Sequence, residues 1–144
     1  MSSEPHPVVR FTSALDGVCP DMLTGFFTGW PHPPTPETHL RLLRGTDAVV
    51  LALDESSGKV VGYIAALTDG VLTAYIGHLE VLPAWRGRGI GSELVRRMLD
   101  NYKDLYMVDL MCDPEVQPFY ERLGMRPNTG MSLRNYAIQS GRSA

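Results

Sequence analysis

A glycine-rich segment between a predicted strand and a predicted helix constrains this chain more than any other feature. Residues 79–92 read LEVLPAWRGRGIGS, in which an apolar strand ends at Pro83 and three alternating glycines, Gly87, Gly89 and Gly91, lead into a helix. The first backbone N–H groups of a helix lack partners within the helix, and the helix dipole adds partial positive charge there. Because glycine lets an anion approach the backbone closely, the segment predicts a phosphate-binding turn.

The segment contains no lysine, which excludes a P-loop. Two other interpretations of the turn stay open. A dinucleotide-binding fingerprint needs G-x-G-x-x-G. Gly87 and Gly89 fit it, Ser92 occupies the third glycine position, and Asp109 follows 20 residues after Gly89, as that motif requires. The remaining alternative is a glycine-rich helix start that binds nothing, although alternating glycines cost backbone entropy without an evident structural return.

The composition bounds the class of protein. With 144 residues we expect one domain, residues 1–144, with flexible ends at residues 1–6 and 140–144. A formal net charge of −3 disfavours a nucleic-acid partner, although Arg86 and Arg88 place positive charge beside the glycine turn. We expect no membrane partner and a cytoplasmic protein, because no apolar run is long enough to span a bilayer and no signal-peptide pattern begins the chain. The two cysteines and four histidines have no metal-ligand spacing, so we expect no metal.

Hydrophobic periodicity predicts a mixed α/β (α+β) fold around one sheet. The proline-rich residues 30–36 suit neither a helix nor a central strand, so they predict a rigid connector between two helical segments. Pro36 suits the first position of the second helix, and Gly45 suits its C-terminal cap. After a first strand, the predicted helices are residues 16–27, 35–44, 90–102 and 115–123, and the predicted strands are residues 48–53, 60–67, 72–82, 105–112 and 131–138.

Two motifs in the expected order resemble those of the GNAT superfamily of N-acetyltransferases. Residues 86–91, RGRGIG, resemble the R/Q-x-x-G-x-G/A signature, and residues 118–125, PFYERLGM, are similar to the second signature, F-Y-x-x-x-G-[FM]. With the V-x-P strand end before the turn, the resemblance covers about residues 72–125. It implies a single GNAT-like domain with helices on both faces of a mostly antiparallel sheet, splayed between two parallel strands.

The resemblance implies acetyl-CoA as co-substrate. The N–H groups at the glycine turn would hold the pyrophosphate, with Arg86 and Arg88 alongside, and the backbone of the preceding strand would pair with the pantetheine arm. Carried over residue by residue, the acetyl-CoA-binding positions are Leu79, Val81, Arg86, Gly87, Arg88, Gly89, Ile90, Gly91 and Ser92.

The same resemblance suggests catalytic residues. Tyr120 stands where the family's usual general acid lies, and a phenol can protonate a departing thiolate at neutral pH. Asp113, where many members carry Asn, resembles the plant and bacterial arylalkylamine (serotonin-type) acetyltransferases and is a candidate base. It also suits the N-cap of the following helix. Glu80 is a second candidate base, or else the partner of a nearby arginine. His78 shares a strand face with Glu80 but does not align with the family's relay histidines.

The acceptor side is expected where the family uses its N-terminal helices and their loop, at Phe27, Trp30 and His32. Aromatic side chains beside the proline-rich connector could stack on an arylalkyl amine, or form a hydrophobic cap over the sheet. We therefore expect an acetyl-CoA-dependent N-acetyltransferase of a primary amine, in particular a small (arylalkyl)amine. A protein N-terminal or lysine acetyltransferase and a non-catalytic acyl-CoA-binding module are the alternatives. A homodimer stays open.

Overall fold

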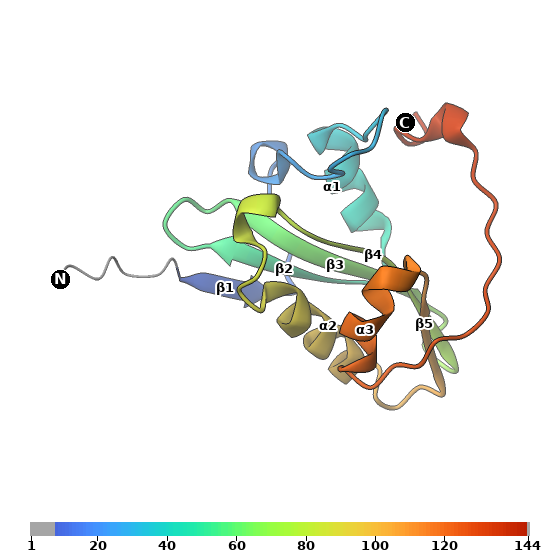
Figure 1. Ribbon diagram of the computed structural model, residues 1–144. Helices are drawn as coiled ribbons and strands as arrows, with labels where there is room; N and C mark the ends of the chain where they lie inside the picture. Colours follow the sequence, from blue (N-terminus) through green and yellow to red (C-terminus); the bar gives the residue numbers. More distant parts are fainter. Residues whose placement is uncertain (1–7, 144) are drawn as a thin grey trace.

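The structure, a computed structural model that describes residues 8–143, contains one five-stranded sheet in the order β1-β2-β3-β4-β5 (Figure 1). Neighbouring strands are antiparallel except for the last pair, because β4 and β5 are parallel. The sequence prediction of a mixed, mostly antiparallel sheet is confirmed. The strands are β1 (Val9–Thr12), β2 (Ala48–Asp54), β3 (Val60–Thr68), β4 (Thr73–Val81) and β5 (Met107–Leu110).

Helices cover both faces of the sheet. The helix α1 (Pro36–Gly45) lies on one face, and α2 (Ile90–Asn101) and α3 (Gln117–Glu121) lie on the other (Figure 1). Pro36 occupies the start of α1 as predicted, and Thr35 caps it by accepting a hydrogen bond from the Thr38 N–H at 3.2 Å. Gly45 is the last helical residue and Thr46 the C-cap, so the predicted cap is displaced by one residue. Short 3-10 helices complete the description: η1 (Pro20–Leu23), η2 (Pro83–Trp85), η3 (Pro114–Val116) and η4 (Tyr136–Ile138).

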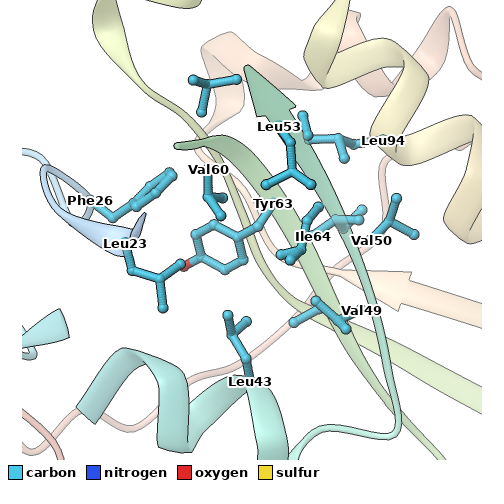
Figure 2. Packing of buried hydrophobic residues seen from close by; sticks show 14 of the residues in the cluster. Leu23, Phe26, Leu43, Val49, Val50, Leu53, Val60, Tyr63, Ile64 and Leu94 are labelled. Atoms are coloured by element: carbon cyan, nitrogen blue, oxygen red, sulfur yellow. The ribbon is translucent and has the colours of Figure 1, made fainter. Parts of the chain in front are cut away.

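The central strand β3 is buried on both faces, because successive side chains of a strand point to opposite sides. Tyr63 packs toward α1 and η1, among Leu23, Phe26 and Leu43 (Figure 2). On the other face, a Cβ at Gly62 would lie 3.3 Å from side-chain atoms of Ile90 and Leu94 in α2. Glycine at this position therefore lets α2 lie close to the sheet, and the position of its N-terminus is set by that contact.

Two predicted elements are wrong. Residues 16–27 contain only the 3-10 helix η1, because Pro20 lacks an N–H and Gly17 and Gly25 adopt positive φ angles of 77° and 93°. Residues 131–138 form no strand: η4 takes the end of the segment, and the remainder is extended chain paired with no strand of residues 8–143. A strand needs a neighbour, and this segment leaves the sheet after α3 (Figure 1).

The predicted flexible ends are only partly described. Residues 1–6 and residue 144 lie outside the described range. Residues 140–143 are exposed, although the Arg142 carbonyl accepts a hydrogen bond from the Arg41 guanidinium of α1. None of the helices within residues 8–143 is long and apolar enough to cross a bilayer.

The parallel strands β4 and β5 separate partway along their length. They pair from Thr73 opposite Met107 to Ile76 opposite Leu110, and there β5 ends. Among residues 8–143, the rest of β4, up to Val81, pairs only with β3, and the register of that pair shifts by one residue at Gly77. Residues 77–81 therefore have one edge without a strand partner. This opening lies directly before the glycine turn.

Candidate active site

The glycine turn places uncapped backbone N–H groups at the start of α2. Gly87 and Gly89 have φ angles of 78° and 81°, a region that L side chains rarely adopt, and a Cβ at either position would meet no atom within 4 Å. Gly89 is the N-cap of α2, and no side chain among residues 8–143 caps this terminus. The first N–H groups of the helix thus lack a side-chain cap among residues 8–143, and the positive end of the helix dipole lies at the same place.

Gly91 differs from the other two glycines of the turn. It lies inside α2, and a Cβ there would lie 3.6 Å from Phe119 of α3 and 3.8 Å from Val81 of β4. Both distances are ordinary van der Waals contacts, so a methyl group fits at this position and packing does not require glycine there. Of the three predicted phosphate-side glycines, Gly87 and Gly89 have the conformation that favours glycine, whereas Gly91 has neither a positive φ nor a contact too short for a Cβ.

The two arginines of the turn are held beside it. Arg86 donates from Nε to the Val81 carbonyl oxygen at 3.0 Å, and Arg88 donates to the Ala84 carbonyl oxygen at 3.3 Å. The Arg88 guanidinium also lies over the Trp85 ring, 4.9 Å from its centre. Both side chains are solvent-exposed. Positive charge is therefore concentrated at the turn although the chain is acidic overall.

A cavity of about 380 Å³, here called the central cavity, lies at the opening between β4 and β5. It brings together residues from five parts of the chain: the loop after η1, β3, β4, the glycine turn and the segment from β5 to α3. Its lining residues are Phe27, Thr28, Trp30, Tyr63, Ile76, Gly77, His78, Leu79, Glu80, Arg86, Leu110, Met111, Cys112, Asp113, Val116 and Tyr120.

Tyr120 faces the central cavity from α3 and is half-buried. Burial, and secondly the proximity of Cys112, raise the pKa of the Tyr120 phenol to about 12. The phenol consequently keeps its proton at neutral pH and can donate it. Tyr120 also packs edge-on against Phe119, with ring centres 4.9 Å apart, which orients the ring.

Asp113 directly follows Cys112 in the sequence and is the N-cap residue of η3. Its carbonyl oxygen accepts from the Val116 N–H at 3.0 Å, but its carboxylate makes no capping hydrogen bond. The carboxylate is exposed and lines the central cavity. It is therefore free to meet a cationic group there. The Cys112 thiol beside it stays protonated, because burial and the charges of Asp113 and Glu115 raise its pKa.

Glu80 has both carboxylate oxygens engaged by the loop after η1. Oε1 accepts from the Phe27 N–H at 2.8 Å, and Oε2 accepts from the Thr28 N–H at 3.2 Å and the Thr28 hydroxyl at 3.0 Å. Phe27 has a φ of 62°, and within residues 8–143 it is the only non-glycine residue with positive φ. Glu80 thus holds a strained loop in place, a contact between positions 53 residues apart that no sequence pattern signalled.

That loop presents two of the three predicted acceptor residues. Phe27 is buried and Trp30 is 40% exposed, and their ring centres are 4.9 Å apart. Both line the central cavity and a neighbouring cavity of about 390 Å³. His32, the third, lines neither of these two cavities. Its backbone N–H donates to Oε1 of Gln139 at 3.1 Å, which ties the loop to the C-terminal end of the chain.

Two further titratable residues, Tyr63 and His78, line the central cavity, and the sequence singled out only His78. Tyr63 was read only as part of an apolar strand, yet it lines the central cavity, and burial raises its phenol pKa. His78, to which the sequence assigned a minor role, also lines the cavity, and burial lowers its pKa, so the imidazole is neutral at pH 7. Within residues 8–143, no group of three or more His, Cys, Asp or Glu side chains is arranged to hold a metal ion.

Comparison with known proteins identifies the family. The acetyltransferase (GNAT) family matches residues 15–125. A crystal structure of a protein from Deinococcus radiodurans R1, provisionally assigned as an acetyltransferase, is 49% identical, with 100% of both chains covered and a TM-score of 0.93. Glucosamine 6-phosphate N-acetyltransferase 1 from Oryza sativa subsp. japonica is 32% identical over 72% of this chain and 72% of its own length.

Serotonin N-acetyltransferase 2, chloroplastic, from the same rice subspecies is 30% identical over 58% of this chain and 44% of its own length. Other curated relatives are longer, and the chain spans 31% to 57% of their length. The resemblance seen in residues 86–91 and 118–125 is thus confirmed, and the chain belongs to the acetyltransferase (GNAT) family.

Proposed function

We propose that this protein transfers the acetyl group of acetyl-CoA to a primary amine, with a small arylalkylamine as the preferred acceptor class. The observation that carries the proposal is the central cavity. It joins a half-buried phenol, a free carboxylate and an aromatic pair at the point where β4 and β5 separate. Family membership implies acetyl-CoA, which would supply the activated acetyl thioester.

The structure has two features that fit acetyl-CoA. The N–H groups from Gly87 to Ser92 suit a pyrophosphate, because the helix terminus is uncapped and Arg86 and Arg88 lie beside it. The unpaired edge of residues 77–81, including Leu79 and Val81, suits the amides of a pantetheine arm, because backbone groups there lack a strand partner. The Val81 carbonyl oxygen already accepts a hydrogen bond from Arg86, so the pantetheine amides would pair with the other backbone groups of that edge.

Direct attack by the amine requires proton transfer at two places, and the cavity offers a residue for each. An ammonium acceptor must lose a proton before it attacks, and the free carboxylate of Asp113 is the group we assign to attract the ammonium and take that proton. The phenol of Tyr120 protonates the departing thiolate. We assign Glu80 to positioning the acceptor loop, since both of its oxygens are occupied.

The aromatic pair supports the acceptor class. Phe27 and Trp30 form one wall of the cavity, and two carboxylates, Glu80 and Asp113, line it as well. An arylalkylamine has a flat ring that can stack on aromatic side chains and an ammonium that carboxylates attract. The named activities of the two rice relatives differ, one acting on an amino sugar phosphate and one on serotonin, so both amine types belong in the test.

The test is release of free CoA from acetyl-CoA with a panel of acceptors. The panel contains an indolealkylamine, a phenylalkylamine, glucosamine 6-phosphate, and peptides with a free N-terminus or a lysine. We expect the highest kcat/KM with the arylalkylamines. Highest turnover with the peptides would instead support a protein acetyltransferase. Tight acetyl-CoA binding without CoA release for any acceptor would support a non-catalytic module and reject the enzyme assignment.

Matched variants test the two assigned residues. Tyr120→Phe removes the proton donor and keeps the ring, so we expect kcat to fall about 100-fold or more while acetyl-CoA binding is unchanged. Asp113→Asn should lower kcat/KM most strongly below the pKa of the amine. Glu115→Gln is the control, because Glu115 is exposed on η3 but does not line the central cavity. Full activity of Asp113→Asn at every pH would rule out Asp113 as the base.

A further inference from the structure

A second cavity adjoins the central cavity on the side of α1. This cavity of about 390 Å³, called here the side cavity, has walls from the loop after η1, from α1 and from residues 139–142. It shares three lining residues with the central cavity, Phe27, Trp30 and His78. The two cavities therefore meet at these side chains, where an elongated ligand can reach into both.

The side cavity is lined by two cations and by no carboxylate. Arg41 of α1 and Arg142 line it, and its lining residues include no Asp or Glu. Within residues 8–143, the salt bridges involve other arginines, and neither of these two forms an ion pair. Both guanidiniums are solvent-exposed, so an anion can reach them. A guanidinium binds a carboxylate or a phosphate through two parallel hydrogen bonds, so this pair suits an anionic group of a ligand.

The C-terminal wall of the side cavity lies against α1 (Figure 1). The Arg142 carbonyl oxygen accepts a hydrogen bond from the Arg41 guanidinium. Gly141 has a φ of 99°, and a Cβ there would lie 2.8 Å from Cγ2 of Thr38 in α1, closer than a real Cβ approaches another atom. Both the backbone angle and this close approach favour glycine. Gly141 thereby lets residues 139–142 lie against the helix, which holds Arg142 at the side cavity.

The central cavity has the opposite charge on its acceptor side, because the carboxylates of Glu80 and Asp113 line it. The arginine that lines it, Arg86, belongs to the glycine turn, where the pyrophosphate is expected. Phe27 and Trp30 lie between the two cavities, since they line both. An acceptor that spans the cavities therefore meets carboxylates at one end, aromatic rings in the middle and guanidiniums at the other end.

We propose that the side cavity is an anion subsite for the acceptor, and that the preferred acceptor is a primary amine whose far end carries a carboxylate or a phosphate. The proposal rests on the proposed acetyl transfer and specifies its substrate class. Arg41 and Arg142 bind the anion, Phe27 and Trp30 contact the middle of the molecule, and the ammonium reaches Asp113. A neutral amine of the same shape lacks the contact with the two arginines and is a poorer acceptor.

Matched pairs of acceptors test the subsite by release of free CoA. Phenylethylamine is compared with its para-carboxylate, tyramine with its O-phosphate, and glucosamine with glucosamine 6-phosphate. We expect kcat/KM to be about 10-fold or more higher for the anionic member of at least one pair, mainly through a lower KM. The first two pairs distinguish a carboxylate from a phosphate as the preferred anion. Equal or lower kcat/KM for the anionic member of all three pairs would overturn the proposal.

Substitutions in the side cavity test the assigned residues. Arg41→Gln and Arg142→Gln should each lower kcat/KM about 10-fold more for the anionic member of a pair than for the neutral member. Gly141→Ala should lower the same preference without removing a charge, because a Cβ there pushes residues 139–142 away from α1. Arg44→Gln is the matched control, since Arg44 is exposed in the last turn of α1 but does not line the side cavity. An unchanged preference in both Arg41→Gln and Arg142→Gln would refute the anion subsite.

A binding measurement separates this proposal from that of acetyl transfer. Calorimetry on the full chain saturated with CoA gives the affinity for both members of each pair without turnover. Tighter binding of an anionic member without CoA release in the assay would support the subsite and reject the transfer. CoA release together with equal binding of both members of every pair would support the transfer and reject the subsite, and binding of no acceptor would reject both. Circular dichroism of each variant verifies that the domain is folded.

Discussion

The buried histidine of α1 leads to a quantitative prediction about stability. His39 is 1% exposed and packs edge-on against Phe26, Phe27 and Tyr63, with ring centres 4.5 to 5.4 Å apart. Neither of its ring nitrogens has a hydrogen-bond partner among residues 8–143. A charged imidazole there would be buried without compensation. Burial, and secondly the nearby His78, lower the pKa of His39 from 6.5 to about 4.

This lowered pKa makes stability depend on pH, and the sign follows from proton binding. Between pH 6.5 and pH 4 the unfolded chain protonates this histidine and the folded chain does not. The free energy of unfolding is therefore unaffected above pH 6.5 and falls as the pH is lowered toward 4. At about 1.36 kcal/mol per pKa unit, the full loss is about 3 kcal/mol, of which about 2 kcal/mol is lost by pH 5.

The perturbation is His39→Phe, which keeps an aromatic ring and removes the titrating group. Urea unfolding at several pH values between 4.5 and 7.5 would measure the free energy of unfolding of parent and variant. The variant carries its own packing cost at every pH, so the comparison is the difference between the two proteins as a function of pH. We expect that difference to shift in favour of the variant by about 2 kcal/mol between pH 7 and pH 5.

The control is His32→Gln, which removes an exposed histidine from the loop. The free energy of unfolding of this variant should change with pH as that of the parent does. His78 titrates in the parent and in both variants, so its contribution largely cancels. If the difference between parent and His39→Phe is the same at pH 7 and pH 5, the burial of an unpartnered histidine is not the cause of acid sensitivity, and the reasoning fails.

Further predictions concern the site. Glu80→Gln leaves one acceptor oxygen in place of two, so we expect the free energy of unfolding in urea to fall by about 1–3 kcal/mol. We also expect the KM for the amine to rise by a larger factor than kcat falls. Unchanged stability would contradict the positioning role of Glu80. Because burial raises the pKa of Tyr120 to about 12, the pH–rate profile should show no loss of this acid between pH 7 and pH 10. A descending limb near pH 9 that disappears in Tyr120→Phe would contradict this. Gly89→Ala forces a side chain to a φ of 81° and should cost about 1 kcal/mol and weaken acetyl-CoA binding, measured by calorimetry. Gly91 has a helical conformation, so Gly91→Ala should unfold at no lower urea concentration than the parent. A larger loss of stability for Gly91→Ala than for Gly89→Ala would contradict the conclusion that Gly89, and not Gly91, is the position that favours glycine.

Local patterns were sufficient for much of the fold. The helices 35–44 and 90–102 and the strands from residue 48 to residue 82 were predicted within a few residues, because each has a strong hydrophobic period and its own start and stop signals. The glycine turn was also predictable, since residue type and order alone determine where backbone N–H groups are left without partners. The predicted helix 16–27 was wrong because two glycines, Gly17 and Gly25, and Pro20 interrupt an apolar pattern that is otherwise compatible with a helix.

The candidate site also has parts that the sequence predicted and parts that depend on the tertiary structure. The sequence by itself determined the parts that lie close together along the chain: the turn of residues 86–92, the half-buried tyrosine of α3 and the family to which they belong. Only the tertiary structure decided how Glu80 is used, that Tyr63 and His78 face the central cavity, and that residues 131–138 leave the sheet. The physical reason is that a carboxylate, a phenol or a strand edge takes its role from the group that meets it, and here those groups lie tens of residues away.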